Sequence, residues 1–191
     1  IVVNGMSAAG RNSRWSNAAF VVETRPEDIP ETFIEQAKSC GCKALAGLLY
    51  RTWLEKEAKR HGKGQAAPAQ KLTDFIAKKD SKVFPQTSYT PGITASRIDQ
   101  WLPKPISERL TEAFKIFGKN MKGFLSKDAI IIAIETRTST PVRIRRDKET
   151  CECISLQGLF PAGEGAGYAG GIVSSALDGE NVCAAILKKL L

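Results

Sequence analysis

Residues 163–172 read GEGAGYAGGI, and their glycine spacing raises the main question about this chain. The stretch contains a G-x-G-x-x-G match, formed by Gly165, Gly167 and Gly170. A strand-like run, Gly158–Ala162, precedes it, and a helix-like run, Gly171–Leu190, follows it. The pattern is typical of a loop that grips a dinucleotide phosphate, although glycine can serve other purposes there.

The residues that follow argue against a dinucleotide fingerprint. A true fingerprint opens a strand–helix–strand unit of about 30 residues, with an acidic residue near the end of the second strand. Residues 171–191 are predicted to be almost entirely helix, which leaves no second strand. Two interpretations remain. The loop lets a ligand approach the backbone beside a helix N-terminus, where anions bind, or it is a closely packed strand-to-helix turn.

Composition sets wider bounds on the function. The chain has 191 residues, 42% of them hydrophobic, which predicts one domain or one plus a small appendage. No apolar run reaches the roughly 18 to 20 residues of a membrane helix, and no secretory signal opens the chain, so we expect a cytoplasmic protein. Because the first residue is Ile1, we expect a piece of a longer protein. The net charge of +8 suits anionic ligands, but without an aromatic-basic motif it favours a lysine-rich surface over nucleic-acid binding.

The five cysteines do not predict a metal site. They form two C-x-C pairs and one single residue, namely Cys40, Cys42, Cys151, Cys153 and Cys183. Two pairs could hold zinc, but zinc ligands are usually spaced C-x2-4-C, and the sole histidine, His61, is not beside them. We expect reduced thiols and no metal.

Hydrophobic periodicity predicts a helical middle between strand-like ends. The predicted helices are Leu45–His61, Pro68–Lys79, Ser107–Lys119 and Gly171–Leu190. The predicted strands are Ala18–Glu23, Asp128–Glu135, Val142–Arg146 and Gly158–Ala162, with a short apolar run at Ile1–Val3. We therefore expect an α+β or α/β fold, in which a mostly helical insert at about 25–125 is carried between two segments of a β-sheet domain.

Four motifs resemble one family. Residues 158–179 resemble the C-terminal flavin motif of two-domain FAD-dependent dehydrogenases, and more narrowly of an uncharacterised bacterial group of them. Residues 135–144 are similar to a second signature of that group. Residues 2–7, with Asn17 and the run after it, match a third, and Ala67–Gln70 with Asp74-Phe75 match a weaker fourth.

The resemblance covers nearly the whole chain and implies that three segments of it belong to different parts of the parent protein. Residues 1–24 would join the FAD domain to the insert, 25–125 would form a helical cap or substrate domain, and 126–191 would be the C-terminal segment of the FAD domain. The family's N-terminal strand, G-x-G-x-x-G turn and ribose-binding acid are not in this sequence. The resemblance therefore implies a parent enzyme that binds FAD. This chain alone would supply only half of the flavin-binding surface, so we expect it to be inactive without the N-terminal domain.

The same resemblance implies which residues face the flavin. Gly163 and Glu164 would contact the ribityl chain, and the backbone of Ala169–Ile172 would face the pyrimidine edge of the ring. The implied cofactor-binding set is Gly163, Glu164, Gly165, Tyr168, Ala169, Gly170, Gly171 and Ile172.

Other roles stay open at this stage. Arg137 and Arg143 are candidates for binding an anionic group of substrate or cofactor, since guanidinium suits carboxylate and phosphate, but solvated strand arginines are an equal alternative. Tyr168 could border the flavin or donate a proton, and the alternative is that its ring only packs in the core. No catalytic acid or base can be named. The expected function is an FAD-dependent oxidoreductase acting on a small molecule. The alternative is a stand-alone binding module with a basic face, for example for RNA.

Overall fold

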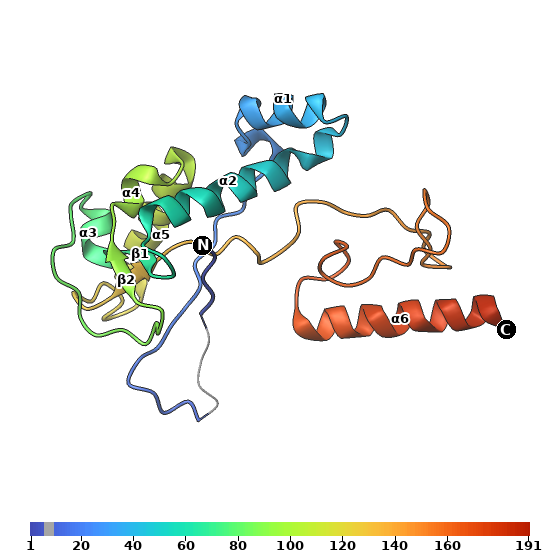
Figure 1. Ribbon diagram of the computed structural model, residues 1–191. Coiled ribbons are helices and arrows are strands. Elements are labelled where there is room, and N and C mark those ends of the chain that lie inside the picture. Colours follow the sequence, from blue (N-terminus) through green and yellow to red (C-terminus); the bar gives the residue numbers. More distant parts are fainter. Residues whose placement is uncertain (6–9) are drawn as a thin grey trace. The chain divides into compact units, whose positions relative to one another are not determined.

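The computed structural model describes residues 1–5 and 10–191, so Met6 and Ser7 of the third motif lie outside the described residues. Figure 1 shows the order of the elements along the chain. They are α1 (Glu31–Ser39), α2 (Ala46–His61), β1 (Ala67–Lys71), α3 (Leu72–Ile76), β2 (Ile93–Ala95), α4 (Ile98–Trp101), α5 (Lys104–Asn120), β3 (Ile130–Ile132) and α6 (Ile172–Leu190). Short 3-10 helices lie at Pro26–Asp28 and Lys43–Leu45.

The chain divides into two compact units. The first unit comprises residues 1–28 and 51–136, and the second comprises residues 29–50 and 137–191. Helix α2 contributes its first turn to the second unit and the remainder to the first. The assignment of residues 1–24, 25–125 and 126–191 to parts of a flavoprotein stays a prediction.

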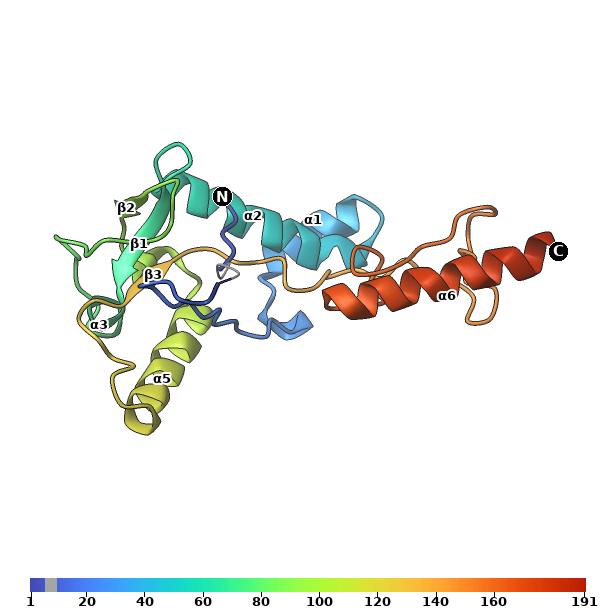
Figure 2. The ribbon, with the colours of Figure 1, turned by 90° about the horizontal axis from the view of Figure 1, so that it is seen from below.

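A small mixed sheet lies at the centre of the first unit (Figure 2). Strand β1 is the middle strand, parallel to β2 and antiparallel to β3. Residues Ala67 to Gln70 of β1 are all buried, although one of them is a proline. Pro68 has no N–H to donate, but its carbonyl accepts a hydrogen bond from the N–H of Ala133, so the strand stays joined to the chain after β3.

The hydrophobic core of this unit joins the sheet to helices α3, α4 and α5. Its buried members are Leu72, Phe75, Ile98, Leu102, Phe114 and Ala133. Aromatic rings extend this core, because Phe114 contacts Phe75 at a centroid distance of 5.8 Å and Phe20 at 5.4 Å. Phe20 also meets Phe117 and Phe124 edge to face, which fixes the segment before α1 against α5.

In the second unit, the chain of residues 137–171 packs along one side of α6. Val182 and Ala185 of α6 are buried together with Cys151, and Phe160 and Ile186 pack against them. Elsewhere in this unit, Phe33 of α1 contacts Tyr50 at a centroid distance of 5.3 Å. This core is smaller than that of the first unit, and it depends on loops rather than on a sheet.

Three of the four predicted helices are confirmed, and so is the α+β class. The predicted helices at 45–61, 107–119 and 171–190 correspond to α2, α5 and α6. Long amphipathic stretches specify their structure locally, so periodicity locates them well. Within the described residues, no helix is both long and apolar enough to cross a membrane.

The predicted helix Pro68–Lys79 is wrong over its first third and at its last three residues. Residues 67–71 form strand β1, and only Leu72–Ile76 are helical. The apolar residues that suggested a helix, Leu72 and Phe75 among them, lie only in this last part. The strand depends on pairing with β2 and β3, which are distant in sequence, so local periodicity could not reveal it.

Most predicted strands are not strands in the structure. Residues 18–23 and 158–162 are loops, residues 142–146 contribute one bridge, from Arg146 to Cys153, and residues 128–135 contain only the three-residue β3. Residues 1–3 form no strand, although the Val3 N–H donates to the Ile134 carbonyl. A β-rich sequence becomes a strand only beside a partner strand, and within the described residues only β3 and the bridge at Arg146 find one.

Truncation of the central aromatic ring tests the core of the first unit. Phe114 is 3% exposed, so Phe114→Ala should lower the free energy of unfolding by about 3–5 kcal/mol. The control is Ile116→Ala on the same helix, where the side chain is 55% exposed and the loss should stay below about 1 kcal/mol. Urea unfolding measures both variants, and equal losses would contradict this core assignment.

An ion pair gives the first unit a defined acid response. Arg109 on α5 donates two hydrogen bonds to the Asp28 carboxylate, at 2.9 and 2.7 Å. These bonds lower the pKa of Asp28 from 3.8 to about 2. Because the folded pKa lies below the unfolded value, the stabilisation is complete above pH 3.8 and is lost as the pH falls towards 2.

Arg109→Gln should therefore return the pKa of Asp28 towards 3.8 and remove its part of the acid-dependent stability. Carboxyl chemical shifts followed over a pH titration measure the change. A pKa near 2 in the variant would show that Arg109 is not the cause.

Candidate functional site

The glycine-rich loop of residues 163–172 lies in the second unit, directly before α6, and two of its glycines have an internal reason. Gly163 and Gly167 have φ angles of +68° and +86°, which favour glycine over other residues. A Cβ on Gly167 would lie 2.8 Å from the carbonyl oxygen of Val142. These two residues shape the turn and let it pack against the chain at residues 142–143.

For two other glycines, neither the backbone conformation nor a contact within the described residues requires glycine. A Cβ on Gly165 or on Gly170 would meet no heavy atom of the described residues within 4 Å, and neither residue has a left-handed φ. Both are exposed. The fold of this chain would therefore accept a side chain at either position, and close approach by another molecule is a physical reason for their absence.

The loop is anchored by Arg146 and Asp178. The Arg146 guanidinium donates to both oxygens of Asp178, at 2.9 and 2.5 Å, and to the carbonyl of Pro161 at 2.6 Å. The N–H of Gly163 donates to the same Asp178 carboxylate at 2.8 Å. The hydrogen bonds from Arg146 lower the pKa of Asp178, with burial acting in the opposite direction. This ion pair joins the start of the loop to the second turn of α6.

Tyr168 and Arg143 hold the far side of the loop. The Tyr168 hydroxyl accepts from the N–H of Arg146 and donates to the carbonyl of Ile144, both at 3.0 Å. The Arg146 guanidinium carbon lies 3.7 Å from the centre of the Tyr168 ring. Arg143 donates through Nε to the carbonyl of Gly167 at 2.8 Å. Both hydrogen-bonding capacities of the Tyr168 hydroxyl are thus used within the chain.

The loop still presents groups without partners. Glu164 is half-buried, and its carboxylate makes no hydrogen bond or ion pair with any residue that the structure describes. The first intrahelical bond of α6 runs from the Ser175 N–H to the Gly171 carbonyl, so the amides of Ile172 to Ser174 have no acceptor within the helix. Ser174 Oγ accepts from the Gly171 N–H and donates to the Gly171 carbonyl.

These groups suit a ligand that carries hydroxyl and carbonyl groups. A free carboxylate accepts hydrogen bonds from hydroxyls, uncapped helix amides donate to carbonyl oxygens, and the open glycines leave room for close contact. Their assignment to a flavin stays a prediction. Arg143 donates to this loop at the Gly167 carbonyl. Arg137 is exposed and begins the second segment of this unit. The roles of both arginines towards an anionic group stay predictions.

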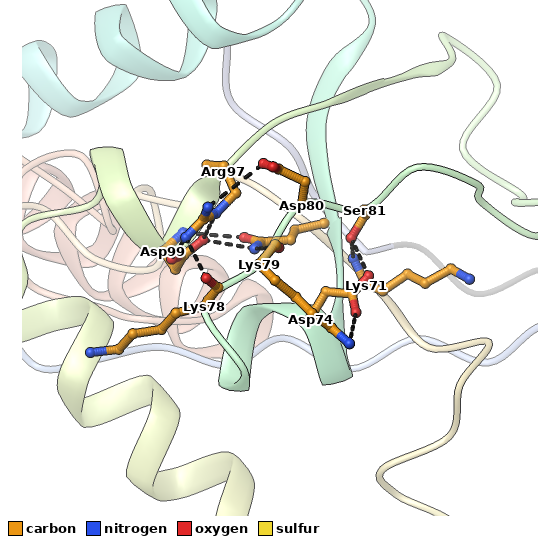
Figure 3. Close-up of polar contacts among 9 residues, drawn as sticks. Lys71, Asp74, Lys78, Lys79, Asp80, Ser81, Arg97 and Asp99 are labelled. Atoms are coloured by element: carbon orange, nitrogen blue, oxygen red, sulfur yellow. Dashed lines mark hydrogen bonds and ion pairs between the residues drawn. The ribbon is translucent and has the colours of Figure 1, made fainter.

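A second polar cluster lies in the first unit, around the fully buried Gln70 of β1. Figure 3 shows its members Lys79, Arg97 and Asp99. The Gln70 amide nitrogen donates to the Lys79 carbonyl at 3.0 Å and to Asp99 at 2.7 Å, and its oxygen accepts from the Asp99 N–H. Arg97 donates through Nε and Nη2 to the two Asp99 oxygens, each at 2.8 Å. Burial raises the pKa of Asp99, but the bonds from Arg97 and Gln70 outweigh it, so that pKa lies below its usual value.

Beside this cluster, a shorter chain of hydrogen bonds joins β1 to α3. The Lys71 N–H donates to Ser81 Oγ, and the Ser81 hydroxyl donates to Asp74, both at 2.8 Å (Figure 3). Gln70 and Asp74 belong to the weaker sequence motif, but nothing in the sequence pointed to Arg97 or Asp99. Their importance depends on contacts with residues about 20 to 30 positions away.

The cysteine pairs do not build a metal centre in the part of the chain described. All five cysteines are free thiols, Cys40 and Cys42 exposed and Cys151 and Cys153 buried. Within residues 1–5 and 10–191, no three metal-ligating side chains gather.

Removal of the loop anchor tests its energetic role. Asp178→Asn should lower the free energy of unfolding by about 2 kcal/mol, because Arg146 and the Gly163 N–H lose a charged acceptor. The control is Glu180→Gln, an exposed carboxylate on the same helix. Amide exchange at Gly163 should accelerate in Asp178→Asn alone, and equal behaviour of the two variants would contradict the anchor.

Comparison with known proteins gives one family and one relative. A family model described as "FAD-dependent protein, C-terminal domain-like" matches residues 1–138. An uncharacterized protein of Clostridium beijerinckii (strain ATCC 51743 / NCIMB 8052) is 39% identical over 194 residues, a match that covers 99% of this chain. The chain spans 34% of the length of that relative. The loop at 163–172 lies beyond the family match but inside the similarity to the relative. On this evidence, the chain belongs to the family of C-terminal domains of FAD-dependent proteins.

Proposed function

We propose that this chain is the C-terminal portion of an FAD-dependent oxidoreductase, a dehydrogenase of a small molecule, and that it supplies the ribityl and ring side of the flavin site. Family membership supports the cofactor. Two observations carry the residue assignment: a Cβ on Gly165 or Gly170 would enter open space, and the Glu164 carboxylate has no partner among the described residues.

Each part of the loop would have a distinct task. Gly163 sets the turn, and Glu164 accepts hydrogen bonds from ribityl hydroxyls. The backbone at Ala169–Ile172 lies against the pyrimidine edge, where the α6 amides donate and the positive end of the helix favours negative charge. Tyr168 supports the loop from behind through its hydroxyl bonds. Bound FAD would supply the redox chemistry.

The proposal includes a partner, the N-terminal FAD-binding domain of a longer protein. Helix α6 has a second apolar face besides the one on its own loops, and its side chains are exposed: Ile172 92%, Val173 72%, Leu177 54%, Leu187 58% and Leu190 76%. Apolar faces of this kind mark interaction surfaces. The relative is about three times as long as this chain, so a further domain to cover the face is in keeping with the family.

A cytoplasmic location also belongs to the proposal, since five free thiols are typical of a reducing compartment. The residues that bind the FAD pyrophosphate would come from the other domain, so this chain alone should retain no FAD.

The test uses the full-length protein that contains this chain, with flavin absorbance per protein as the readout. Gly170→Ala should lower flavin content and Gly170→Val should lower it further, by about tenfold or more, since a Cβ would fill the space that the ring needs. Because that Cβ meets no heavy atom of the described residues within 4 Å, the fold should be unaffected.

Gly179→Ala is the matched control, since its Cβ also meets no heavy atom of the described residues within 4 Å and it lies within α6, outside the loop segment 163–172. Unchanged flavin content and redox potential in Gly170→Val would refute the site. A colourless wild-type protein that binds nucleic acid in a salt-sensitive way would favour the alternative basic module instead.

A further inference from the structure

A pocket of about 360 Å³ lies in the first unit, beside the cluster around Gln70. Its walls come from Lys78, two residues after α3, from α4 with the residues around it, and from the first turns of α5. The lining includes three cationic side chains, Lys78, Arg97 and Lys104, and two carboxylates, Asp99 and Glu108, together with Gln100, Leu102 and Ser107. This volume is in the range of small-ligand sites.

The wall formed by Asp99 does not repel an anion. The Asp99 side chain is 3% exposed, and both of its oxygens accept from Arg97, with Gln70 donating to one of them. Ser107 donates to the Asp99 carbonyl, which ties the start of α5 to the same wall. The negative charge is therefore neutralised inside the protein, and the wall is held rigidly by hydrogen bonds.

Positive charge remains on the other side of the pocket. Arg97 uses Nε and Nη2 for Asp99, whereas its Nη1 lies 3.6 Å from the Asp80 carboxylate, which is too long for a hydrogen bond. The Asp80 side chain is 75% exposed, so an incoming carboxylate can replace it at little cost. Asp80 thus shows the kind of group that this edge of Arg97 attracts.

Two lysines add to this charge. The Lys78 amino group has no ion-pair partner within the described residues. In Figure 3 its side chain extends away from the Arg97–Asp99 pair, so it would join a ligand held by Arg97 only after a change of rotamer. The Lys104 side chain is 85% exposed, and its contact with Glu108 is 3.8 Å long. Such exposed pairs hold their partners weakly, so Lys104 is available to a ligand.

The backbone at Lys78 gives a separate reason to assign its side chain a role. Lys78 follows the end of α3 with a φ of +53°, a conformation that favours glycine or asparagine at this position. Its N–H and that of Lys79 donate to the carbonyls of Phe75 and Asp74, as expected where a helix ends in this way. A lysine here costs stability, which suggests that its amino group serves another purpose.

We propose that this pocket binds the carboxylate group of a small anionic ligand, with Arg97 Nη1 and the amino groups of Lys78 and Lys104 as its donors. Guanidinium and ammonium groups around a rigid, neutralised wall suit such a group. The proposal concerns the first unit alone and does not depend on flavin binding.

The experiment titrates the 191-residue chain with malonate at constant ionic strength and follows amide chemical shifts. We expect saturable binding, with shift changes centred on residues 78, 97, 100 and 104. Lys78→Asn should weaken malonate binding about tenfold while its Tm stays equal or rises, because asparagine accepts the left-handed backbone. Lys104→Gln should also weaken binding.

The matched control is Lys127→Asn, which removes the same charge from an exposed residue that does not line the pocket. It should leave malonate affinity unchanged. Absence of saturable binding, or equal weakening by Lys127→Asn, would overturn the proposal. Tighter binding of inorganic phosphate than of malonate would overturn the assignment to a carboxylate.

Discussion

The packing of the first unit depends on the hydrogen bonds of one fully buried side chain, Gln70. An amide removed from water must find partners for its N–H groups and its oxygen, or the fold loses stability. Gln70 finds them on two segments at once, the turn after α3 and the start of α4. Since Gln70 lies on the middle strand, this one side chain connects the sheet to the helices that pack over it. The Arg97–Asp99 pair is fixed by the same contacts and forms one wall of the neighbouring pocket.

In the second unit, an ion pair rather than a buried amide holds the polypeptide segments together. Its glycine loop has no sheet to support it, so its shape depends on the Arg146–Asp178 pair and on the Tyr168 hydroxyl. Those bonds stay within the chain, whereas the Glu164 carboxylate and the amides of Ile172 to Ser174 have no partner among the described residues, and Gly165 and Gly170 border open space. A cofactor site needs a loop that is held rigidly by its own contacts and also carries polar groups without hydrogen-bond partners. Such groups are already positioned before the ligand arrives.

The sequence predicted what depends on local periodicity and missed what depends on distant partners. Helices α2, α5 and α6 follow from their apolar spacing alone. Local periodicity predicts a helix where strand β1 lies, since the strand depends on β2 and β3. The apolar run at 18–23 is a loop that places Phe20 against α5. The assignment of Gly163 to Ile172 to a flavin site comes from resemblance and stays a prediction. Arg97 and Asp99 had no local signal, because only the folded chain brings them to Gln70.

The central claim is that the loop at 163–172 contacts the flavin. The most direct measurement is a crystal structure of the full-length protein with FAD bound. We predict a Glu164 oxygen within about 3 Å of a ribityl hydroxyl, and an amide from the start of α6 at similar distance from the pyrimidine edge of the ring. A flavin bound elsewhere in the protein, with this loop in contact with solvent alone, would contradict the account.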